Sequence, residues 1–65
     1  MNDQDEVLYI SPAKAARILG VSRWTVYELV KADRFPSKRL DGRILIEHTP
    51  LMDYVDSLPS AAESA

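Results

Sequence analysis

The side chains that could carry out chemistry are few in this 65-residue chain, and their types argue against catalysis. His48 is the only histidine and cysteine is lacking, which excludes Cys–His nucleophile pairs and zinc sites built from cysteine and histidine. Asp53 and Asp56 stand three residues apart, a spacing that most often marks a solvated helix face. Both glycines fall at expected turns, so the sequence has no phosphate-cradling glycine loop. We therefore expect no enzyme activity, no metal and no cofactor.

Side chains that can hold an anion, in contrast, gather in the middle of the chain. All eight lysines and arginines lie between positions 11 and 43, where only three acids accompany them and the net charge is +5. The first ten residues carry −3 and residues 44–65 carry −4, which gives −2 overall. A basic centre between acidic ends is typical of a face that binds an anionic partner such as nucleic acid. Charge alone leaves an ordinary solvated surface open as the alternative.

Residues 23–31 place two large aromatic side chains among charges. With the period of an α-helix, Trp24, Tyr27, Glu28 and Lys31 fall on one face, opposite an apolar stripe. Exposed aromatic surface usually contacts a partner, although either ring could instead fold over a neighbouring element as half-buried core.

This segment is the second of two predicted helices that flank a three-residue turn. The first is expected over residues 12–19 with Ser11 as N-cap, and the second over residues 23–31 or 32 with Ser22 as N-cap. Gly20 ends the first helix, because glycine adopts the left-handed conformation at little cost. Two helices joined in this way are typical of a helix-turn-helix, although an ordinary helical hairpin has an equally short turn.

A β-hairpin and a third helix are predicted to follow. Asp41-Gly42 lies between two short β-prone runs and predicts a type I′ turn, so residues 37–46 form a hairpin that we call the wing. Thr49-Pro50 predicts the start of a third helix, with Thr49 as N-cap, that runs for about nine residues and ends before Pro59.

The predicted core consists of the apolar side chains that share one side of each element. They are Ala15, Ala16, Ile18 and Leu19 in the first helix, Val21 as an apolar plug in the turn, Val26, Leu29 and Val30 in the second helix, Phe35 in the connector, and Leu51, Tyr54, Val55 and Leu58 in the third helix. The expected organisation is a disordered acidic lead-in over residues 1–6, one domain over residues 7–58 and a flexible tail over residues 59–65. With no apolar run of membrane-spanning length and no signal peptide, we expect a soluble cytoplasmic protein that does not bind membranes.

Together these features predict a mainly α-helical winged helix-turn-helix that binds double-stranded DNA. The major groove admits a helix whose N-terminal half contacts base edges, and a helix start can hold a phosphate. The expected contacts of this recognition helix are Ser22, Arg23, Trp24, Thr25, Tyr27, Glu28 and Lys31. The expected contacts of the wing are Lys38, Arg39 and Arg43, which would meet the adjacent minor groove or its phosphates. Glu28 could accept a hydrogen bond from cytosine N4 or could only repel wrong registers.

Residues 9–58 resemble the winged helix-turn-helix of the excisionases, which is similar to the DNA-binding domain of MerR-type regulators. The resemblance rests on five short motifs: Ala15-Ala16, the run from Leu19 to Arg23, Thr25-Val26-Tyr27, Phe35-Pro36 and Asp41-Gly42-Arg43. Two positions depart from the pattern: Lys14 stands where the family often has glutamate, and Asp33 where glycine is common. Asp33 is compatible with the fold, because aspartate tolerates the left-handed conformation better than most residues.

The resemblance implies an excisionase, or recombination directionality factor, of a temperate phage or integrated element, with phages of actinobacteria as the favoured source. Such proteins bind and bend attachment-site DNA and direct a partner integrase toward excision, without catalysis of their own. MerR-type regulators carry a long dimerisation helix, which these 65 residues do not include, so we expect head-to-tail copies on direct repeats in place of a palindrome. A small transcription regulator of the same fold and a protein-interaction adaptor are the alternatives.

Overall fold

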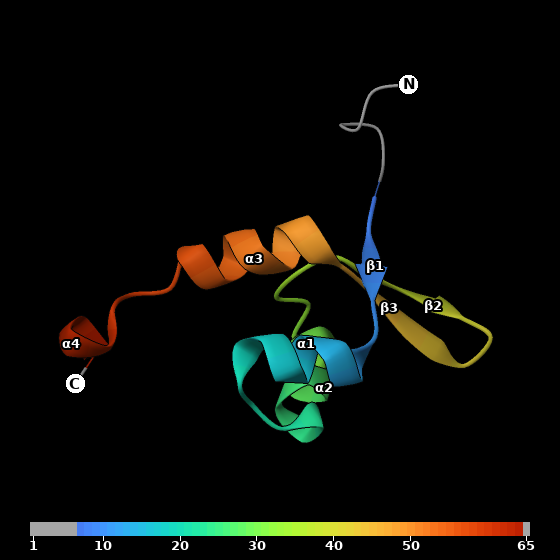
Figure 1. Ribbon diagram of the computed structural model, residues 1–65, viewed down its shortest axis with the longest axis horizontal. Coiled ribbons are helices and arrows are strands. Elements are labelled where there is room, and N and C mark those ends of the chain that lie inside the picture. Colours follow the sequence, from blue (N-terminus) through green and yellow to red (C-terminus); the bar gives the residue numbers. More distant parts are fainter. Residues whose placement is uncertain (1–6, 65) are drawn as a thin grey trace.

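The computed structural model describes residues 7–64, so the predicted lead-in, residues 1–6, lies outside the described residues. The elements along the chain are β1 (Tyr9–Ile10), α1 (Pro12–Leu19), α2 (Arg23–Lys31), β2 (Ser37–Leu40), β3 (Arg43–Glu47), α3 (His48–Asp56) and α4 (Ala61–Ser64). α1 and α2 lie together below the sheet, β2 and β3 project to one side as the wing, and α3 extends to the other side (Figure 1). This arrangement is a winged helix-turn-helix, as the sequence predicts.

The first two helices begin and end where the sequence predicts, because their caps are local. The Oγ of Ser11 accepts a hydrogen bond from the backbone N–H of Lys14 at 3.1 Å, and the Oγ of Ser22 accepts one from Thr25 at 3.1 Å. Gly20 adopts the left-handed conformation, with φ 71°, and its N–H donates to the carbonyl of Ala16. Each helix therefore carries its own start signal, and α1 also carries its own stop signal.

The hairpin turn has the backbone conformation that its two residues predict. Asp41 and Gly42 both have positive φ, 49° and 77°, as a type I′ turn requires. The sheet has one strand more than predicted, since β1 pairs with β3 on the side away from β2. β1 has only two residues, too few for a period-2 pattern, and its partner strand follows more than 30 residues later. Local sequence signals therefore could not identify it.

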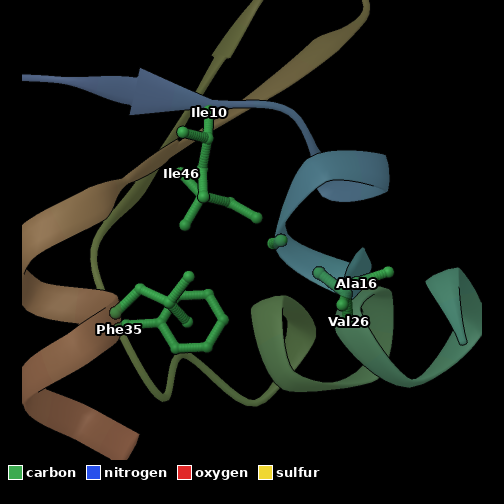
Figure 2. Packing of buried hydrophobic residues seen from close by; sticks show 7 residues of the cluster. Ile10, Ala16, Val26, Phe35 and Ile46 are labelled. Carbon is green, nitrogen blue, oxygen red and sulfur yellow. The ribbon is translucent and has the colours of Figure 1, made fainter. Parts of the chain in front are cut away.

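The core lies where α1, α2, α3 and the sheet meet. Ile10 and Ile46 approach it from the sheet, Ala16 and Val26 come from the two packed helices, and Phe35 lies against α3 (Figure 2). Ala15 and Leu51 complete the buried cluster. The predicted burial of Ala15, Ala16, Val26, Phe35 and Leu51 is thus confirmed.

Three of the predicted core residues are exposed, and two of them lie at the end of α1 and in the turn that follows it. Ile18 and Val21 each keep 40% of their surface accessible. Ile18 lies roughly 100° around α1 from the stripe formed by Ala15, Ala16 and Leu19, so it reaches only the edge of the contact with α2. Val21 follows the left-handed Gly20 and lies in an open groove between the helices, where it does not act as a plug.

The third helix starts and ends differently from the prediction. It begins at His48, with Glu47 as N-cap and no side-chain cap hydrogen bond, so Thr49 is inside the first turn and is not the cap. The N–H of His48 donates to the carbonyl of Leu8 at 2.9 Å, so a contact with the distant start of the chain sets this end. The helix ends at Asp56, and Leu58 is consequently exposed instead of joining the core.

A contact between two aromatic rings supports the position of α3. The ring of Tyr54 meets the ring of Phe35 edge to face, with centroids 5.6 Å apart, which fixes α3 to the connector between α2 and β2.

Within the predicted tail, Ala61–Ser64 form the four-residue α4. Among the described residues, no helix is both long and apolar enough to cross a membrane.

Candidate nucleic-acid interface

The exposed face of α2 carries the aromatic side chains that the sequence assigns to it. Trp24 is 70% exposed and Tyr27 is 43% exposed, while Val26 on the opposite face is fully buried. Neither ring therefore belongs to the buried core. Large rings left in solvent cost hydration free energy, and they can stack on or pack against a partner without any rearrangement of the domain.

The start of α2 is organised by a pair of hydroxyl groups. Besides capping the N–H of Thr25, the Oγ of Ser22 lies 3.0 Å from the Oγ1 of Thr25, within hydrogen-bond distance. This contact fixes the orientation of Thr25. The N–H groups of Arg23 and Trp24 belong to the first turn, where no intrahelical acceptor exists, and they lie at the positive end of the helix dipole. These groups suit a phosphate oxygen.

The two charged residues farther along this face form an ion pair with each other. The Nζ of Lys31 lies 3.6 Å from an Oε of Glu28, one helical turn away, and both side chains are exposed. An exposed pair of this spacing contributes only about 0.2–0.5 kcal/mol, so a ligand can break it at little cost. Glu28 is thereby compensated in the free protein, and Lys31 can turn toward an anion when one approaches.

The strand register of the wing places its three cations, Lys38, Arg39 and Arg43, on two different faces, although the sequence groups them together. Arg39 pairs with Ile44, and residues paired across antiparallel strands project from the same face. Because Ile46 shares this face and is buried, Arg39 projects on the helix side of the sheet. Lys38 and Arg43 occupy the alternate positions and project from the other face. All three side chains are exposed.

A cleft of about 280 Å³ separates α2 from the wing. Tyr27 lines it from α2, Ser11 and Pro12 line it from the start of α1, and residues 42–45 line it from the wing tip. The exposed face of α2 and the wing are therefore close neighbours, and a nucleic-acid backbone that passes between them would contact both. Of the predicted contact residues, Tyr27 and Arg43 are the two that line this cleft, from α2 and from the wing.

One further cation, Arg17, lies beside the start of α2 and is not among the predicted contact residues. Arg17, near the end of α1, lines an open groove together with Arg23. Helical periodicity predicts that Arg17 is exposed, but its distance from Arg23 depends on how α1 crosses α2. No local pattern reports that crossing, so the sequence could not identify the pair.

Comparison with known proteins agrees with this geometry. A family model described as a helix-turn-helix domain matches residues 9–59, which span β1 to the end of α3 and therefore include α2 and the wing. No curated protein and no solved structure shows a significant match to the chain.

Proposed function

The chain belongs to the helix-turn-helix domain family, which includes excisionase-like DNA-binding proteins, and we propose that it is itself an excisionase. Family membership implies sequence-specific binding to double-stranded DNA. In our proposal the protein binds and bends the attachment-site DNA of a phage or integrated element and directs the partner integrase toward excision. It acts without catalysis and in the cytoplasm of the bacterial host.

The observation that carries the DNA-binding part is the exposed aromatic face of α2 beside a cationic wing. Trp24 and Tyr27 are accessible on α2, and the cleft next to Tyr27 opens toward the wing tip. In a complex, α2 occupies the major groove with Arg23, Trp24 and Thr25 in the groove and Ser22 at a flanking phosphate, while the wing meets the adjacent minor groove. Tyr27 and Lys31 contact flanking phosphates or sugars.

The charge distribution supports binding of several copies in one direction along DNA. Asp53 and Asp56 are exposed on α3, which extends from the sheet on the side opposite to the wing (Figure 1). One end of the domain is thus acidic and the other is basic, so the acidic end of one copy can face the basic end of the next. Such contacts are heterologous and suit direct repeats. A row of copies on successive repeats can bend the duplex.

A mobility-shift titration tests this proposal. The probes are the attachment region beside the gene and a random duplex of equal length, each at low and at moderate salt. We expect stepwise cooperative shifts on attachment DNA, anomalous mobility from bending, and a log–log salt slope of roughly −4 to −5 if four to six phosphates are engaged. Equal and weak binding to both duplexes at both salt concentrations would contradict it and favour a protein partner.

An excision assay separates the excisionase from a transcription regulator with the same fold. The substrate carries the two recombined attachment sites, and the integrase is supplied with or without this protein. We expect excision with the wild-type protein and with Val7→Ala, which removes an exposed apolar side chain outside α2 and the wing, and a loss of excision with Trp24→Ala. Excision that is independent of the protein, together with repression of a neighbouring promoter, would replace the excisionase by the regulator.

A further inference from the structure

A groove of about 490 Å³ runs between the end of α1 and the start of α2. Small residues form much of its lining, namely Ala13, Ala16 and Gly20, together with Val21. Arg17 lines it from α1 and Arg23 from α2, so two cationic residues from different helices border one open depression. Gly20 has no heavy atom within 4 Å of the position that a Cβ would occupy, so this part of the groove is unobstructed.

Among the residues that the structure describes, the two arginines have no acidic partner that would explain their position. Within residues 7–64, neither guanidinium forms an ion pair, and the pair that does occur there joins Lys31 and Glu28. Arg17 stands in the last turn of α1, where a cation interacts favourably with the helix dipole. That role requires only one positive charge and does not account for a second arginine across the groove.

We propose that this groove binds a backbone phosphate of the DNA, held between Arg17 and Arg23. The inference rests on the proposed DNA-binding function and extends it to α1, which has no assigned contact. A guanidinium presents parallel N–H donors that match phosphate oxygens, and the apolar lining from Ala13 to Val21 can accept the adjoining sugar. Because Arg23 directly precedes Trp24, a phosphate in the groove lies next to the bases that Trp24 would contact.

A phosphate at this place has a definite consequence for recognition. Contacts to phosphates fix the position and direction of a recognition helix but carry no sequence information. Arg17 therefore acts as a positioning residue: it ties α1 to the backbone and sets how far α2 enters the major groove. Its loss lowers the affinity for every duplex by the same factor and leaves the ratio between target and random DNA unchanged.

The salt dependence of Arg17→Ala tests the inference. Each phosphate contact contributes about 0.9 to the log–log slope, so its loss makes the slope shallower by about 0.9. If the variant and the wild-type protein bind equally at 1 M salt, a slope difference of about 0.9 lowers the affinity of the variant about eightfold at 0.1 M and about threefold at 0.3 M. Fluorescence anisotropy with a target and a random duplex measures both quantities. A merely structural loss would reduce the active fraction equally at all salt concentrations and leave the slope unchanged.

Two control variants separate this site from a general effect of charge. Arg34→Ala removes the same charge from an exposed position beyond the other end of α2, and we expect it to keep the wild-type slope. Arg17→Lys keeps the charge, and we expect it to keep most of the slope.

If Arg17→Ala and Arg34→Ala give the same slope while the wild-type protein binds DNA, the inference is overturned and the proposed function stands. If the wild-type protein binds no duplex, both fail. If it binds no duplex but Arg17 is needed to bind an acidic peptide, the groove is a protein-binding site.

Discussion

Replacement of Ser22 tests whether one residue both starts the recognition helix and lies against DNA. Its Oγ accepts the N–H of Thr25 at 3.1 Å and lies 3.0 Å from the hydroxyl of Thr25. Ser22→Ala removes both contacts. Ser22→Asp supplies a carboxylate that can accept the same N–H, but it places a negative charge where a phosphate is expected. Ser22→Ala should therefore destabilise the domain whereas Ser22→Asp should not, and both variants should weaken DNA binding.

The magnitudes follow from the geometry of the cap. Loss of an N-cap hydroxyl costs about 1 kcal/mol, and the exposed contact between Ser22 and Thr25 adds little because water replaces it. In a domain of this size, 1 kcal/mol lowers Tm by about 4–8 °C. In Ser22→Asp the carboxylate caps the helix and interacts with its dipole, so Tm equals or slightly exceeds the wild-type value. Its DNA affinity falls about tenfold at 0.1 M salt, which is the effect of about one unit of charge at a phosphate.

The assay combines thermal melting followed by circular dichroism with anisotropy titrations on one duplex. Ser11→Ala is the matched control, since the Oγ of Ser11 caps α1 through Lys14 with the same 3.1 Å bond. We expect Ser11→Ala to lower Tm about as much as Ser22→Ala while its folded fraction binds DNA normally. If Ser22→Asp melts as early as Ser22→Ala, the cap is not the stabilising contact. If Ser22→Asp binds DNA as tightly as wild type, the start of α2 does not face the phosphates.

Three further tests address the helix face, the wing and the core. Trp24→Ala changes stability by less than about 0.5 kcal/mol, because the ring is 70% exposed. It lowers the DNA affinity measured by anisotropy at least tenfold. An unchanged affinity would exclude this face from the DNA contact. Arg39→Ala weakens DNA binding more than Lys38→Ala, because Arg39 projects on the helix side of the wing; equal losses would contradict that assignment. Ile46→Ala removes a fully buried side chain and lowers the free energy of unfolding by about 2–5 kcal/mol, a large part of the stability of so small a domain. Ile46→Val lowers it by only about 1 kcal/mol. A urea titration measures both losses. A mild loss for Ile46→Ala would show that the core tolerates a cavity there.

The parts of the fold that the sequence predicts are those with local causes. The bounds of α1 and α2 follow from Ser11, Gly20 and Ser22, whose caps act within one turn of the helix. The wing follows from Asp41-Gly42, whose positive φ angles define the turn. In each case the residues that carry the signal also make the contact, so no knowledge of the rest of the chain is needed.

The parts that the sequence mispredicts depend on segments that are distant along the chain. α3 begins at His48 because its N–H meets Leu8, and β1 exists because Ile10 lies beside Ile46. The burial of Ile18 was predicted from its apolar character, whereas helical geometry alone places it at the edge of the stripe. The same distinction holds for the candidate interface. Helical periodicity identifies the exposed face of α2. The groove between α1 and α2, however, depends on how the two helices cross, which no local pattern gives.

One part of the interface was available in the sequence. Strand residues alternate between faces, so Lys38 and Arg39 must project in opposite directions once the turn at Asp41-Gly42 is set. The three wing cations could therefore have been separated before the structure was known. Only the buried position of Ile46 identifies which of the two faces belongs to the helix side.

Selection from a random duplex library, followed by titration, tests the central claim that α2 and the wing recognise DNA by sequence. The account predicts that the wild-type protein enriches a common motif and binds it about a thousandfold more tightly than a scrambled duplex at moderate salt, near the lower end of the range for specific DNA-binding proteins. It also predicts that Trp24→Ala loses this preference while keeping its fold. Enrichment of no motif, or equal affinity for the enriched and scrambled duplexes, would contradict the claim.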